Sequence, residues 1–146
     1  MSPQKCFPVN LRDGGSSVGN ESQMNIPLEI LVIERFFKKD KRDRYISFIS
    51  SRKNRKKFIQ TLPHLRDLNW DLFNEVSCFD PGLVGVDSGS CYVTSEDASV
   101  DQTILSATDI DKLADSGQAF ILVFGDAKQI YYEGEPPFNR YISQCF

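Results

Sequence analysis

The residues of this chain best suited to chemistry are cations, and they crowd into one short segment. Between Lys38 and Lys57 the chain has ten lysines and arginines against two aspartates. Clustered cations neutralise phosphates and release counterions, so such a segment is typical of a surface that contacts nucleic acid. A solvated or acid-paired helix face has the same composition. The candidate basic contact face comprises Lys38, Lys39, Lys41, Arg42, Arg44, Arg52, Lys53, Arg55, Lys56 and Lys57.

The charge of the whole chain allows two interpretations of this segment. Residues 1–66 have 14 basic and 6 acidic side chains, a net charge of +8, whereas residues 67–146 have 3 and 14, a net charge of −11. Either the two halves fold against each other and partly neutralise, or the surface has a basic face for one partner and an acidic face for another. No RRM, KH or zinc-finger signature accompanies the cations, and no aromatic residues alternate with glycines for base stacking.

Carboxylates offer a second chemistry, that of a hydrolase or a metal site. Glu96, Asp97 and Asp101 follow one predicted strand, and Glu133 and Glu135 follow another. If those strand ends adjoin, the carboxyl groups supply the acid and base that a hydrolase needs. Acidic turns are also common for solubility alone, and we therefore expect no catalytic residue and no metal ligand among them.

Other motifs that indicate an enzyme or a cofactor are missing from the sequence. Asp109, Asp111 and Asp115 lack the glycine and glutamate of a calcium loop, and Asp109 and Asp111 suit the first turn of a helix instead. His64 is the single histidine, so the sequence contains no histidine metal cluster and no clear triad. Glycine-rich phosphate loops and CxxC pairs are also missing. We expect no cofactor, reduced thiols and a protein that is not an enzyme.

Two tyrosines that run directly into acids form a second candidate surface. Adjacent residues of a strand point to opposite faces, so one tyrosine must face the core and the other the opposite side. The outward tyrosine either anchors a partner or covers a sheet face, and the sequence leaves open which one it is. This candidate polar and aromatic surface comprises Tyr131, Tyr132, Glu133 and Glu135.

Helices are expected to position the cations. Apolar residues recur at helical spacing from Pro27, and proline fits a first helical turn. Asp40 is the expected N-cap of a second helix, and Ser51 is the expected N-cap of a third, which Pro63 stops. A short helical turn is expected around Trp70.

Strands are expected in the second half of the chain, after a long loop. A short helix with a capping-box spacing at Thr108 separates the first two strands, and short connections make the last three an antiparallel meander. The predicted fold class is α+β, with N-terminal helices packed on a C-terminal, mainly antiparallel sheet. The expected strands are Cys91 to Ser95, Ala119 to Phe124, Gln129 to Glu133 and Arg140 to Ser143.

Residues 1–25 have the composition of a disordered leader, and residues 26–146 form a single predicted domain. Met24 precedes the first periodic segment, which suggests the hypothesis that translation starts there and that residues 1–23 are an upstream extension. The longest strongly apolar run, Ala119 to Phe124, spans six residues, and the N-terminus lacks the core of a signal peptide. We expect a soluble, cytoplasmic protein without membrane contact.

Four short segments resemble a small family of uncharacterised bacterial proteins. The similarity extends over residues 26–143, and it implies a one-domain bacterial protein without a known activity or site. The segments are KRDRY at 41–45, CYVTS at 91–95, YYEGE at 131–135 and RYI at 140–142.

These observations lead to three functional hypotheses, and they leave the oligomeric state open. The first is a non-catalytic binding or regulatory module that contacts another protein through its basic helices or its sheet face. The second is a nucleic-acid-associated protein that uses residues 38–57. The third, ranked lowest, is a hydrolase built on Glu96, Asp97, Glu133 and Glu135.

Overall fold

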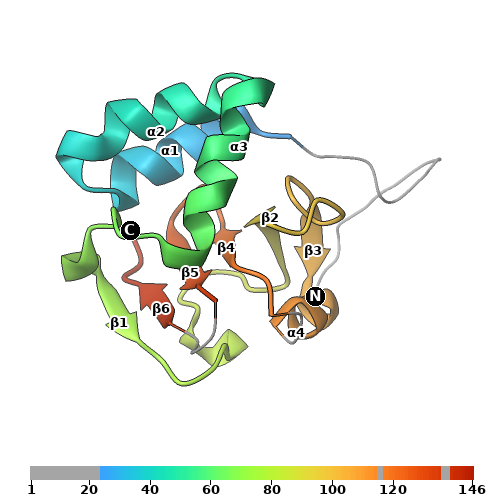
Figure 1. Ribbon diagram of the computed structural model, residues 1–146. Coiled ribbons are helices and arrows are strands. Elements are labelled where there is room, and N and C mark those ends of the chain that lie inside the picture. Colours follow the sequence, from blue (N-terminus) through green and yellow to red (C-terminus); the bar gives the residue numbers. More distant parts are fainter. Residues whose placement is uncertain (1–23, 115–116, 136–138) are drawn as a thin grey trace.

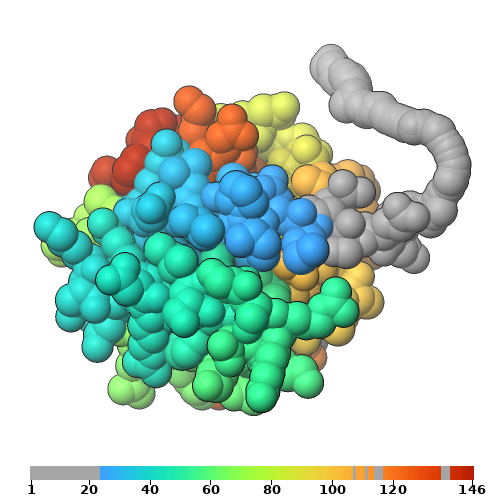
Figure 2. Space-filling model, turned by 90° about the horizontal axis from the view of Figure 1, so that it is seen from above, coloured from blue at the N-terminus to red at the C-terminus, as the bar shows by residue number. Residues whose placement is uncertain are grey.

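The computed structural model describes residues 24–114, 117–135 and 139–146, which form the predicted α+β fold (Figure 1). Three helices form one layer over an antiparallel sheet, and seen from above their blue-to-green residues hide most of that sheet (Figure 2). The predicted leader lies outside the described residues, apart from its last two residues. The helices of this layer are α1 (Ile26–Phe36), α2 (Arg42–Ile49) and α3 (Arg52–Thr61).

The sheet has six strands in the order β1-β6-β5-β4-β2-β3, and every neighbouring pair is antiparallel. The predicted meander is confirmed, because β4 pairs with β5 and β5 pairs with β6. The sequence pattern does not predict β1 or β3, which have three residues each and lie at the two sheet edges. The strands are β1 (Phe73–Glu75), β2 (Ser90–Ser95), β3 (Ile104–Ser106), β4 (Phe120–Phe124), β5 (Gln129–Glu133) and β6 (Arg140–Ser143).

Helix α1 begins where its sequence supplies a cap. The side chain of Asn25 accepts a hydrogen bond from the amide of Leu28 at 3.1 Å, and a proline occupies the first turn. Its apolar stripe, which includes Ile33 and Phe36, is buried in the core between the helices and the sheet. Glu29 lies on the same buried side of this helix, so a carboxyl group enters the core.

The predicted cap of the third helix is confirmed, whereas the predicted cap of the second is wrong. Ser51 accepts a hydrogen bond from the amide of Asn54 at 3.1 Å at the start of α3. Asp40 lies instead inside a 3-10 helix, Lys39–Lys41, and Lys41 occupies the cap position of α2 without a side-chain bond. Because the 3-10 helix occupies residues 39–41, α2 begins at Arg42. The cap position therefore falls on Lys41 and not on Asp40.

The opposite face of the sheet is also covered. Helix α4 (Ala107–Ala114) lies there, and the segment from Val76 to Val86 packs against the same second core cluster (Figure 1). Alternate strand residues serve the two cores, so Tyr131 is buried under α4 and this segment while Tyr132 is buried under the helical layer. The described chain also forms 3-10 helices at Leu62–His64, Trp70–Leu72 and Pro81–Leu83.

The described cysteines are free thiols. Cys78 and Cys145 are exposed, whereas Cys91 is buried, and burial raises the pKa of the Cys91 thiol to about 12. Within the described ranges, no helix combines the length and apolar character needed to cross a membrane.

Candidate functional site

Nine of the ten residues of the candidate basic contact face lie at least partly exposed on the helical layer. Seven of them are exposed, and Lys41 and Arg42 are half-buried. The Nε of Arg42 donates to the carbonyl oxygen of Phe37 at 3.2 Å, which ties this guanidinium to the end of α1. We call these nine residues the cationic surface: Lys38, Lys39, Lys41, Arg42, Arg44, Arg52, Lys53, Lys56 and Lys57.

Arg55 is the exception, and its assignment to an exposed contact face is wrong. Its relative exposure is 8%, and its side chain points into the molecule. Arg55, Phe58 and Leu62 follow each other at helical spacing and form the buried face of α3 and the turn after it. Arg55 is therefore buried because of its position on the helix, whereas the neighbouring cations of α3 are exposed.

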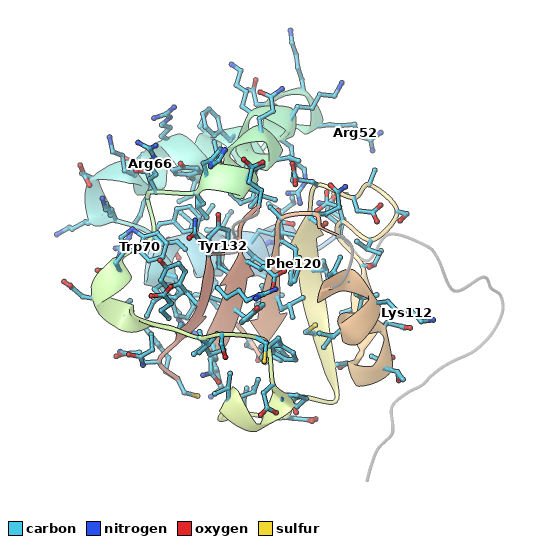
Figure 3. The ribbon with its side chains drawn as sticks, turned by 60° about the horizontal axis from the view of Figure 1, so that its bottom comes forward. Arg52, Arg66, Trp70, Lys112, Phe120 and Tyr132 are labelled. Atoms are coloured by element: carbon cyan, nitrogen blue, oxygen red, sulfur yellow. The ribbon has the colours of Figure 1, made fainter. Side chains whose placement is uncertain are left out.

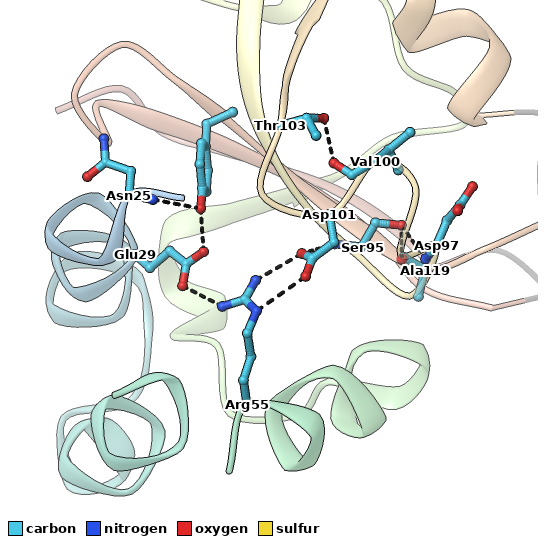
Figure 4. A network of polar contacts seen from close by, with 10 residues as sticks. Asn25, Glu29, Arg55, Ser95, Asp97, Val100, Asp101, Thr103 and Ala119 are labelled. Carbon is cyan, nitrogen blue, oxygen red and sulfur yellow. Dashed lines mark hydrogen bonds and ion pairs between the residues drawn. The ribbon is translucent and has the colours of Figure 1, made fainter. Parts of the chain in front are cut away.

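Arg55 joins three parts of the fold through two carboxylates. Its Nη1 lies 2.5 Å from Oε1 of Glu29 on α1, and its Nη2 lies 2.9 Å from Oδ1 of Asp101 in the loop between β2 and β3. A second bond runs from its Nε to Oδ2 of Asp101 at 3.2 Å. Figure 4 shows the guanidinium reaching from α3 between the two carboxylates. This arrangement links helix to helix and the helical layer to the sheet.

Tyr92 completes this buried network. Its hydroxyl donates to Oε2 of Glu29 at 2.6 Å and accepts from the amide of Asn25 at 3.2 Å. Burial raises the pKa of Glu29 above its usual range, although Arg55 and Tyr92 oppose that shift. The adjoining cavity measures about 10 Å³, room for a water molecule at most. We therefore assign a structural role to the network.

Three of the four residues of the candidate polar and aromatic surface are buried, so its assignment as a surface is wrong. Tyr131, Tyr132 and Glu133 are 0%, 2% and 1% exposed, because the sheet is covered on both faces. Glu133 lies among partners, with the hydroxyl of Tyr131 at 2.7 Å and Nε of Arg140 at 3.0 Å from its Oε1. Glu135 alone is partly exposed, and its Oε1 lies 2.7 Å from Nε2 of His64.

The carboxylates of the hydrolase hypothesis bond to separate groups. Glu96 accepts a hydrogen bond from the amide of Ala119 at 2.8 Å. Asp97 accepts two bonds from Ser99, which lower the pKa of the Asp97 carboxyl. Among the described residues, no group of three or more His, Cys, Asp and Glu side chains is arranged to hold a metal ion.

A groove that the sequence pattern does not reveal lies beside the helical layer. Its volume is about 180 Å³, and its lining residues come from two parts of the chain that are distant in sequence, residues 64–70 and residues 132, 139 and 141. Figure 3 shows Arg66 and Trp70 of this groove on the side of the molecule away from Arg52, with Tyr132 further towards the centre. The residues of the groove are His64, Leu65, Arg66, Trp70, Tyr132, Asn139 and Tyr141.

Hydrogen bonds and a ring contact fix the aromatic side chains of the groove. The indole nitrogen of Trp70 donates to the carbonyl oxygen of Arg66 at 3.1 Å, and the rings of Trp70 and Tyr141 lie 4.7 Å apart. Tyr132 donates to the carbonyl oxygen of Leu62 and accepts from the amide of Leu65 at 3.1 Å. The groove is thus built on side chains that are already ordered.

The groove adjoins the Lys38 end of the cationic surface through the backbone. The amide of Lys38 donates to the carbonyl oxygen of Asp67 at 2.8 Å, and Phe37 forms an isolated β-bridge with Leu68. These contacts place the segment carrying Arg66 against the start of the basic stretch. Arg66 is exposed there, so a cationic residue and the aromatic residues of the groove meet at one end of the helical layer.

Comparison of the chain with protein-family models, with curated proteins and with solved structures found no match. The resemblance to a bacterial family therefore stays a prediction.

Proposed function

We propose that this protein is a non-catalytic binding module that holds a polyanionic partner on its cationic surface. The observation that carries the proposal is the exposure of seven lysines and arginines on α2, α3 and the turn before α2. The two interspersed acids, Asp40 and Asp43, leave this stretch strongly positive. Free thiols at the described cysteines support a cytosolic setting.

Nucleic acid is the polyanion that we favour as partner. Protein interfaces centre on aromatic and apolar anchors, with charges at the rim. The exposed large apolar residues of the described chain are Met24, Leu83, Ile104 and Phe146, and none of them belongs to α2 or α3. A surface of cations without an apolar centre suits a phosphate backbone, which needs neutralisation and positioning.

An acidic protein segment is the second candidate. Asp40 and Asp43 are exposed within the cationic surface, where they would repel a continuous phosphate backbone. A protein segment that mixes acids with a few basic residues could match this alternation of charge. The two candidates separate by direct comparison of their binding.

The experiment measures binding of a labelled single-stranded RNA and of a labelled poly-glutamate peptide by fluorescence anisotropy at low salt. The first variant replaces Lys56 and Lys57 with glutamine, and the control replaces Lys112 and Lys128, which are also exposed and carry the same charge. Each lost phosphate contact weakens binding, and the size of this electrostatic effect decreases as the salt concentration rises.

The proposal predicts that RNA binds, that K56Q/K57Q weakens it and that K112Q/K128Q changes it little. Tighter binding of the peptide than of the RNA would transfer the assignment to the second candidate. If neither polyanion binds at low salt, or if both double variants weaken binding equally, the cationic surface is not the contact site.

A further inference from the structure

We infer that the groove beside the cationic surface receives one unpaired base of a single-stranded nucleic acid. This inference rests on the proposed function and specifies which form of nucleic acid the protein selects. The cations hold the backbone, and the groove takes the base next to it. The residues on which the inference depends are Arg66, Trp70, Asn139 and Tyr141.

The size of the groove suits part of a ligand. Pockets for whole small molecules measure about 300 to 1,000 Å³, and this groove measures about 180 Å³. A base on a longer strand needs only its own space, because the rest of the strand lies outside. The adjoining cationic surface is positioned to hold that remainder through phosphates.

The chemistry of the groove also suits a base. Trp70 and Tyr141 supply aromatic rings, on which bases stack irrespective of sequence. Asn139 is exposed at the groove and offers an amide that can donate to and accept from a base edge. Arg66 adds donors where the groove meets the surface, next to the expected path of the phosphates.

A duplex cannot use this groove without opening. Its bases are stacked on each other and paired, so a side-chain ring cannot reach a base face. A duplex and heparin still offer negative charge to the cationic surface. Selectivity for single strands over duplex of equal charge is therefore the distinguishing property of the groove.

The fluorescence of Trp70 can be used to test this inference. Trp70 is the single tryptophan of the sequence and lines the groove, so its fluorescence reports on that place alone. The full chain is titrated with a single-stranded oligo-uridine of about ten nucleotides, with a duplex of the same length and with heparin. Free N-acetyltryptophanamide, titrated in parallel, corrects for absorption by the nucleic acid.

We expect saturable quenching by the single strand and no quenching by the duplex or heparin. Replacement of Tyr141 by alanine should lower the single-strand affinity about tenfold, since stacking contributes this much per base, while heparin retention stays unchanged. The exposed Asn139→Ala variant should also weaken single-strand binding without affecting the fold. Lys112→Gln serves as the surface control and should leave the quenching as it is.

Failure of the inference differs from failure of the proposed function. Retention on heparin without quenching by the single strand, or equal quenching by the duplex, overturns the base site and leaves the polyanion proposal standing. If no polymer binds at all, the proposed function fails. A titration with uridine monophosphate then tests whether the groove binds a nucleotide. Quenching by the mononucleotide keeps a nucleotide site there, and its absence removes both.

Discussion

Arg55 donates two hydrogen bonds to Asp101, from Nε at 3.2 Å and from Nη2 at 2.9 Å, across 46 positions of sequence. The same guanidinium contacts Glu29 on α1. One cation of the basic stretch is therefore used inside the molecule, where it fastens the helical layer to the sheet. The exposed cations on the same helix remain available for a partner.

Replacement of Arg55 by methionine should destabilise the protein by about 3 to 5 kcal/mol, because it leaves two desolvated carboxylates without their common partner. Urea unfolding measures this loss. Arg52→Met is the matched control, since Arg52 is an exposed arginine one turn earlier on the same helix, and its effect should stay within about 0.5 kcal/mol. Equal losses in both variants would contradict the structural role of Arg55.

The stability contributed by Glu29 should depend on pH in a defined direction. Burial raises the pKa of Glu29 in the folded chain above its ordinary value of 4.5. Between pH 4.5 and the raised pKa of Glu29 in the folded chain, the folded chain binds the proton more tightly than the unfolded chain. The free energy of unfolding therefore falls as pH rises through this range. The stability of the wild type relative to Glu29→Gln should therefore decline as pH rises from 4.5, and level off above the folded pKa. A relative stability that increases with pH would mean that Arg55 outweighs burial.

Gly134 allows the end of β5 to approach the turn behind the groove. A Cβ atom at this position would lie 2.9 Å from the carbonyl oxygen of Pro63 and 2.9 Å from the hydroxyl of Tyr132. Gly134→Ala should cost about 1 to 3 kcal/mol in thermal or urea unfolding, because backbone atoms must move apart. Gly82→Ala is the control, since its Cβ would lie 3.4 Å from the exposed Asp80. A stability loss at Gly82 as large as that at Gly134 would refute the close approach.

The cysteines should differ sharply in reactivity. Cys78 and Cys145 are exposed, whereas burial protects Cys91 and raises its pKa to about 12. Iodoacetamide at neutral pH should modify the two exposed thiols of the native protein and leave Cys91 unmodified, as peptide mass mapping would show. Modification of these three described cysteines in urea provides the control. Rapid labelling of Cys91 in the native state would contradict its burial.

The strands were predictable because their residues favour extended backbone, and the observed β2, β4, β5 and β6 lie within one residue of the predicted bounds. The edge strands have too few residues to carry a pattern of their own. Their pairing with β6 and β2 comes from tertiary structure. Local strand propensity thus predicts the centre of the sheet better than its edges.

The candidate sites were harder to predict because composition does not specify what covers a residue. The sequence places Arg55 among nine other cations, and only the packing of α3 shows that it faces inward. It places Tyr131 and Tyr132 on opposite faces, but not that both faces are covered. The groove joins residues 64–70 to residues 139–141, and the only local signal was a histidine, an arginine and a tryptophan close together after Pro63.

The most direct test of the cationic surface is the salt dependence of single-stranded RNA binding. The slope of log affinity against log salt counts the phosphate contacts, at about 0.7 for each contact with a single strand. We expect a steep slope for the wild type that decreases by about 1.4 when Lys56 and Lys57 become glutamine, which corresponds to two lost contacts. An unchanged slope in that variant, or affinity independent of salt, would contradict phosphate binding by the cationic surface.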